Sequence, residues 1–96
     1  MTVYLGLVHK DPDSEYGISF PDVPGCISAG ATMEELMGTG REALIFHLDM
    51  LERDSDPIPR ARSYEELRTD ATFLEDASDA VILVPIEREP ALQAAE

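Results

Sequence analysis

The stretch from Tyr16 to Glu35 constrains the fold of this chain more than any other part of it. Its first five residues, YGISF, alternate large apolar side chains with Gly and Ser, which is typical of a strand with one apolar face. The next five, PDVPG, predict a turn, because both prolines fix φ, Asp22 can bond its own downstream backbone and Gly25 permits positive φ. The residues that follow, Cys26 to Gly30, then form the returning strand. We therefore expect a hairpin that leads directly into a helix.

The helix that follows the hairpin is marked by its start. Thr32 is a helix N-cap, and Glu35, three residues later, is placed to close a capping box. Apolar residues then recur at helical spacing and predict a helix from Met33 to about Arg53. Three further apolar residues, Ile45, Phe46 and Met50, widen the apolar surface. They either fill core at a sheet edge, which is the favoured interpretation, or form an association surface.

The rest of the chain supplies two more strands and a short helix. Thr2 to Val8 is apolar on both faces, which predicts a central strand. Ser63 with Glu66 repeats the capping pattern and predicts a helix ending near Arg68. Residues 71–79 are expected to be an irregular acidic connector, and residues 80–86 a buried strand in which Pro85 prevents pairing on one side.

These elements predict an α+β domain with the order β-β-β-α-α-β. Because a long crossover separates the last strand from the meander, we expect that strand to lie parallel beside the first, after a right-handed connection. A chain of 96 residues has room for one such core. No internal repeat or low-complexity tract divides it.

The charge of the chain limits its partners. Seven basic and 20 acidic residues give a net charge of −13. Nucleic-acid binding depends on Lys and Arg at the phosphates, so this balance argues against it and favours a basic partner. The single cysteine fits a reducing compartment. No apolar run approaches the about 18 residues of a membrane span, and the N-terminus lacks the pattern of a signal peptide, so we expect a cytoplasmic protein.

We expect no enzyme activity, metal or cofactor. The strand Thr2–Val8 contains no carboxylate, so the acids needed to hold Mg²⁺ do not converge from the sheet. His9 is expected to be solvated at a strand end, and His47 to be a packing residue beside the helix stripe. Cys26 lacks a basic neighbour that would lower its pKa, and is expected to be a buried small side chain. Zinc-ligand spacing and a glycine-rich phosphate loop are both missing.

The run YGISFPDVPGCISAG, followed by Thr and paired Glu at a helix start, resembles the N-terminal domain of HicB-like antitoxins. The later segment from Ile58 to Leu67 continues the resemblance, which covers roughly residues 3–87. It implies a reduced ribonuclease-H-like fold, with a four-stranded mixed sheet of order 3-2-1-4, in one domain over residues 1–88 and a frayed tail at 89–96. The residues to which the resemblance gives a structural role are Tyr16, Phe20, Pro21, Asp22, Pro24, Gly25, Cys26 and Gly30.

The resemblance implies an antitoxin that neutralises a small basic, mRNA-cleaving HicA-like toxin and forms a homo-oligomer, a dimer or tetramer. The acids that could contact such a toxin lie at the end of the long helix and on the short one: Asp49, Glu52, Asp54, Asp56, Glu65 and Glu66.

Two other functions stay open. The first is autorepression, since full-length family members bind DNA through a further segment. Glu87–Glu96 is too short for that segment, so direct DNA binding by this chain is not expected, and any such role would pass through a partner. The second is a stand-alone regulatory or structural homo-oligomer, in which the edge strand at Cys26–Gly30 pairs with another copy.

Overall fold

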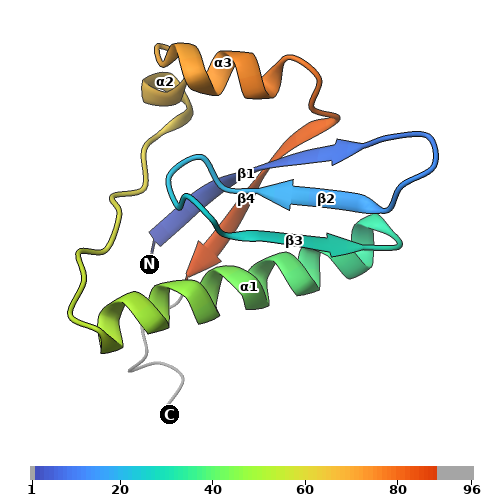
Figure 1. The fold of residues 1–96 in the computed structure, drawn as a ribbon. Helices are drawn as coiled ribbons and strands as arrows, with labels where there is room; N and C mark the ends of the chain where they lie inside the picture. The colour runs from blue at the N-terminus through green and yellow to red at the C-terminus, as the bar shows by residue number, and fades with distance from the viewer. Residues whose placement is uncertain (1, 89–96) are drawn as a thin grey trace.

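The computed structural model describes residues 2–88 and contains one four-stranded sheet (Figure 1). Its strands are β1 (Thr2–Lys10), β2 (Tyr16–Ser19), β3 (Ile27–Gly30) and β4 (Ile82–Arg88), in the order β3-β2-β1-β4. The predicted meander, the central first strand and the strand order are confirmed. The tail predicted at 89–96 lies outside the described residues.

The direction of β4 differs from the prediction. Every neighbouring pair in the sheet is antiparallel, so the sheet is not mixed. β4 begins opposite Val8 and ends opposite Thr2. The reason is the additional helix that precedes it, α3 (Ala71–Ala77), which carries the chain along the sheet before β4 turns back.

The prediction of an irregular connector at residues 71–79 was wrong, because α3 forms there. Asp70 caps this helix by accepting a hydrogen bond from the Thr72 N–H at 2.9 Å. Phe73 and Ala77, four residues apart, turn toward the sheet, where Phe73 is buried. That spacing was the available signal, and the acidic residues between the apolar ones obscured it. The observed order is β-β-β-α-α-α-β.

The two predicted helices are present. α1 runs from Met33 to Arg53, with Thr32 accepting the Glu35 N–H at its start. The Glu35 carboxylate instead accepts from Ala31 N–H at 3.3 Å, so this cap is not the reciprocal box that we expected. The short helix α2 (Tyr64–Leu67) does have the full capping box between Ser63 and Glu66.

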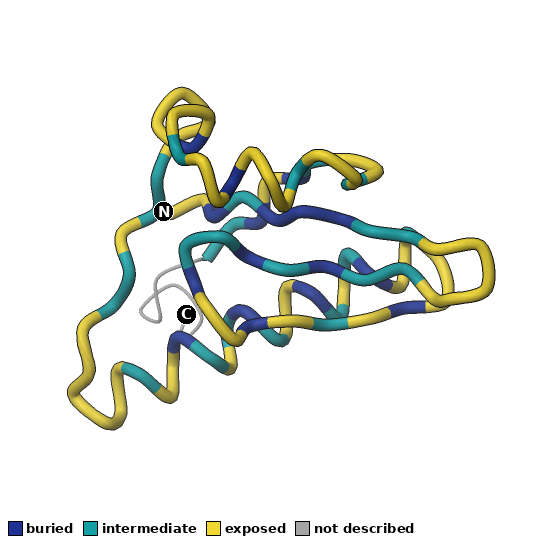
Figure 2. The backbone as a smooth tube through the Cα atoms, turned by 45° about the horizontal axis from the view of Figure 1, so that its top comes forward, coloured by how far each residue is buried: buried dark blue, intermediate teal, exposed yellow. Residues whose placement is uncertain are grey.

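The sheet carries helices on both faces (Figure 1). α1 packs against the face that contains Tyr4, Val8 and Ile18, where the larger core lies. α2 and α3 cover part of the opposite face through Leu7, Leu67 and Phe73. Successive side chains of a strand point to opposite faces, which is why β1 contributes to both cores. Figure 2 shows buried backbone where α1 meets the sheet and exposed backbone along its outer side.

One glycine of α1 allows its close contact with the sheet. A Cβ on Gly40 would lie 3.2 Å from Ile18 Cγ2, whereas a Cβ on Gly38 would meet open space. Gly40, and not Gly38, is therefore the position of this helix at which a side chain would disturb the contact with β2.

Each edge of the sheet carries a feature that disfavours pairing with another strand. On β3, the Ala29 carbonyl accepts a hydrogen bond from Thr39 Oγ1 of α1 at 3.0 Å. On the other side of the sheet, Val8 O accepts a hydrogen bond from Val81 N–H, so Val8 directs its backbone groups toward β4. This direction alternates from residue to residue, so Leu5 directs its backbone groups away from β4. Pro85 lies opposite Leu5, and the position at which it lacks an N–H therefore faces the free edge of β4. Natural sheets use such devices against edge-to-edge association.

Two of the three apolar residues beside the α1 stripe do not fill core. Phe46 is 64% exposed and Met50 is 40% exposed, while Ile45 is half-buried. The favoured interpretation was therefore wrong for Phe46 and Met50, and an association surface remains.

Within residues 2–88 no helix has the length and apolarity to cross a bilayer.

Candidate binding surface

A turn joins β2 to β3 where the sequence predicts one. Gly25 has a φ of +87°, which lies in the left-handed region. Val23 N–H donates to Phe20 O at 3.0 Å, and Cys26 N–H donates to Val23 O at 3.1 Å. Phe20, Val23 and Cys26 are all buried. The turn thus has an apolar interior that fixes its shape.

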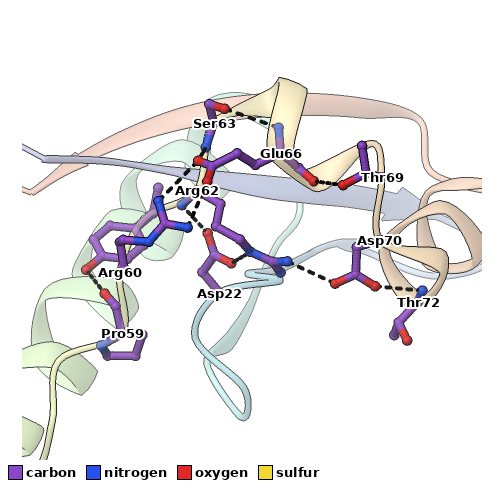
Figure 3. Close-up of polar contacts among 10 residues, drawn as sticks. Asp22, Pro59, Arg60, Arg62, Ser63, Glu66, Thr69, Asp70 and Thr72 are labelled. Atoms are coloured by element: carbon purple, nitrogen blue, oxygen red, sulfur yellow. Dashed lines mark hydrogen bonds and ion pairs between the residues drawn. The ribbon is translucent and has the colours of Figure 1, made fainter.

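Asp22 of this turn binds a distant residue rather than its own downstream backbone, which corrects the prediction. Its side chain is only 6% exposed and pairs with Arg62, whose Nε donates to Oδ1 at 2.6 Å. The Arg62 backbone N–H donates to Oδ2 at 2.7 Å. The same guanidinium donates to Asp70 at 2.9 Å (Figure 3). Arg62 therefore joins the turn to the residue that caps α3.

These contacts affect the protonation of Asp70. Hydrogen bonds from Arg62 and from the Thr72 N–H hold the pKa of the Asp70 carboxyl below its usual range. The N-cap of α3 is therefore an ionised carboxylate at neutral pH.

One of the predicted contact acids, Glu66, is already engaged within the chain. Arg60 donates to its two oxygens at 3.1 and 2.8 Å, and Ser63 N–H donates at 2.9 Å. The Arg60 hydrogen bond, followed by that from Ser63, lowers the pKa of Glu66 to about 2. Its first role in this structure is to cap α2.

The other predicted acids lie in separate places. Asp49 and Glu52 of α1 both accept from Arg88 of β4, at 3.3 and 3.1 Å. Asp54 is the C-cap of α1, and Asp56 is exposed in the loop beyond it. Glu65 is exposed on α2, on the other side of the sheet. The six acids therefore form no single cluster.

Sequence reasoning missed an apolar surface around α3. One hollow of about 200 Å³ lies beside this helix, and three of its lining side chains are large and exposed: Tyr64 at 48%, Leu74 at 52% and Ile82 at 48%. The other residues lining it are Leu7, Phe73, Ala77, Ala80 and Leu83. The exposed positions could be found in the sequence only once the helix at 71–77 was known.

A second hollow, of about 310 Å³, separates α3 from the turn between β2 and β3. Leu7 lines both hollows, so they belong to one face of the sheet. Ile27, which is 71% exposed, lines the second hollow together with Thr72 and Asp76 of the α3 segment. The remaining lining residues are Ser19 and the turn residues Phe20, Pro21, Pro24, Gly25 and Cys26.

The cysteine and the two histidines that were considered as catalytic groups are each buried or partly covered by neighbouring residues. Cys26 is buried, and burial raises the pKa of its thiol, so the expectation of a buried small side chain is confirmed. His9 is partly covered rather than fully solvated, with Nε2 3.0 Å from the Asp76 carbonyl and 3.2 Å from the Asp79 carboxylate. His47 is half-buried beside Gly25. In residues 2–88, no group of His, Cys, Asp and Glu side chains is placed to hold a metal ion.

Comparison with known proteins identifies a family whose sequences match this chain. A family model described as the HicB-like antitoxin of bacterial toxin–antitoxin systems matches residues 4–96. An uncharacterised 14.9 kDa protein of Haemophilus phage HP1 is 41% identical over 51 residues, which are 53% of this chain and 38% of that protein. The chain thus spans well under half the length of this relative.

Two solved structures are similar over nearly the whole chain. The Burkholderia pseudomallei antitoxin HicB has a TM-score of 0.77 and 26% identity, over 95% of this chain and 66% of that one. A chain of the HicA3 and HicB3 toxin–antitoxin complex has a TM-score of 0.70 and 25% identity, over 93% of this chain and all of that one.

Proposed function

This chain belongs to the HicB-like antitoxin family, and on that premise we propose that it neutralises a small basic, mRNA-cleaving HicA-like toxin by covering it. The single observation that carries the proposal is the family match over residues 4–96. It is supported by the similarity of the fold to a chain solved in a HicA3–HicB3 complex.

The charge of the chain supports the same partner. A net charge of −13 attracts a basic protein and accelerates the encounter between them. An acidic protein that covers the basic surface of a ribonuclease also competes there with the phosphates of its RNA. The antitoxin needs no chemistry of its own for this, and we propose that it is not an enzyme and acts in the cytoplasm.

The acids proposed as contacts now differ in what binding would require. Asp54, Asp56 and Glu65 are exposed carboxylates without an ion-pair partner among residues 2–88, so they can meet a cation directly. Asp49, Glu52 and Glu66 already pair with Arg88 or Arg60, and would have to share or exchange that partner.

A homo-oligomer is the second candidate function, and the exposed side chains of Phe46 and Met50 favour it. They lie four residues apart on the outer side of α1 and offer an apolar patch to another copy. The edge strand β3 is less suited, since Thr39 already engages its Ala29 carbonyl. Light scattering of the purified chain tests this alternative, and a strict monomer would count against it.

The test of toxin neutralisation uses the product of the reading frame adjacent to this chain's gene, where the proposal expects a small basic protein. We expect the two to co-purify as a stable complex, and co-expression to restore growth that the basic protein alone arrests. A complete absence of binding at low salt, where attraction between opposite charges is strongest, would refute the proposal.

A further inference from the structure

The surface around α3 combines exposed apolar side chains, two hollows and unpaired acids. We propose that this surface, called here the α3 face, is where the basic toxin docks. The α3 face consists of the hollow beside Leu74, the hollow beside Ile27, and the exposed acids of the α2–α3 segment. The inference rests on the proposed function, because it places the partner named there.

The apolar part of the α3 face offers anchor points. Leu74 projects from α3 with half of its surface exposed, and Tyr64 and Ile82 are similarly exposed around the same hollow. On the far side of α3, Ile27 is exposed beside the second hollow. Contiguous exposed apolar surface marks interaction sites on soluble proteins. Interfaces derive most of their affinity from a few apolar or aromatic anchors seated in such pockets.

The polar part of the α3 face specifies the charge of the occupant. Residues 64–83 contain six acids and one arginine. Two of these acids, Glu66 and Asp70, are neutralised by Arg60 and Arg62. The exposed carboxylates of Glu65, Glu75 and Asp76 have no cationic partner in the described part of the chain. Acids that surround an apolar centre attract a basic partner and exclude an acidic one.

The position of the α3 face depends on the turn between β2 and β3. Arg62 holds Asp22 of the turn and Asp70 of the α3 cap in one network (Figure 3), which fixes the helix over the sheet. Pro21, Pro24 and Gly25 of the same turn line the second hollow. The turn thus contributes to the proposed surface and, through Arg62 and Asp70, also anchors the N-terminal end of α3. Figure 2 shows that the outer side of α3 is open to solvent.

The test compares exposed apolar positions inside and outside the α3 face. Leu74→Gln removes an anchor from α3, and Ile27→Thr removes one from β3 while keeping a β-branched residue. Val3→Thr is the matched control, since Val3 is also apolar and exposed but lines neither hollow. Binding of each variant to the basic protein expected from the adjacent reading frame is measured by calorimetry, and the association rate by stopped-flow mixing. Thermal unfolding checks that each variant is folded.

We expect Leu74→Gln and Ile27→Thr each to weaken binding by about tenfold or more, and Val3→Thr to leave it unchanged. Replacing Glu75 and Asp76 with their amides is expected to reduce mainly the association rate and its salt dependence. Wild-type binding that persists in all three α3-face variants would overturn the inference and leave the proposed function standing. An equal loss of binding in Val3→Thr would also overturn the inference, because Val3 lies outside the α3 face. A wild-type chain that binds nothing would refute both.

Discussion

Arg62 donates two hydrogen bonds, from its backbone N–H and its Nε, to the carboxylate of Asp22, which lies 40 positions earlier in the chain. The carboxylate is almost fully covered, whereas about a third of the arginine side chain is exposed. A covered carboxylate is stable only with donors that replace its lost water. The long connection between α1 and α3 is therefore held to the β2–β3 turn by one side chain and its backbone.

We expect Arg62→Met to destabilise the protein by about 2–3 kcal/mol, because Asp22 would be left charged and without its main partner. The effect is less than for a fully buried pair, since Arg62 keeps contact with solvent. Urea unfolding measures it. Arg68→Met, at an exposed position after α2, is the control and should change stability by less than about 0.5 kcal/mol. Equal effects of the two substitutions would contradict a structural role for the pair.

Stability should decrease as the pH falls through the titration of Glu66. The pKa of this carboxyl is lowered from 4.5 to about 2 by Arg60 and Ser63. A lowered pKa in the folded state means that the contribution is complete above pH 4.5 and is lost as the pH approaches 2. The measurement is unfolding free energy against pH, with Glu66→Gln as the variant that removes this part of the slope. The titration of the Glu66 carboxyl can be followed by NMR. A midpoint near pH 4.5 would show that the Arg60 contact does not persist in solution.

Two glycines around α1 should respond to alanine in opposite directions. A Cβ on Gly38 meets open space, so Gly38→Ala should stabilise the helix by about 0.5–1 kcal/mol. A Cβ on Gly30 would lie 2.7 Å from the backbone nitrogen of Leu36, so Gly30→Ala must displace the start of α1. We expect it to cost about 1–3 kcal/mol, as overpacking does. Thermal unfolding of both variants measures these changes in stability. An unchanged stability in Gly30→Ala would mean that α1 packs less closely against β3 than the structure shows.

The thiol of Cys26 should react slowly in the folded protein. It is 3% exposed, and burial raises its pKa, so both access and the thiolate fraction are reduced. Labelling with a chromogenic disulfide reagent should be slow without denaturant and rapid in urea. Fast labelling of the native chain would show that the turn opens on its own.

Local patterns in the sequence located most of the elements, because the signals that they use involve residues only a few positions apart. The alternation from Tyr16 to Phe20 marked β2, and the caps at Thr32 and Ser63 marked the starts of α1 and α2. The same reasoning failed at α3, where Asp70 caps a helix whose single buried residue, Phe73, gives too weak a periodic signal.

Contacts between distant residues were decided by the tertiary structure alone. Strand β4 runs antiparallel to β1 because α3 carries the chain to the end of the sheet near Val8, and nothing within residues 80–86 encodes that direction. Asp22 pairs with Arg62, and Asp49 and Glu52 pair with Arg88, although each acid could equally have been solvated. Side-chain periodicity shows which face of an element is apolar. Which partner covers that face, and which cation reaches which carboxylate, depends on the path of the whole chain.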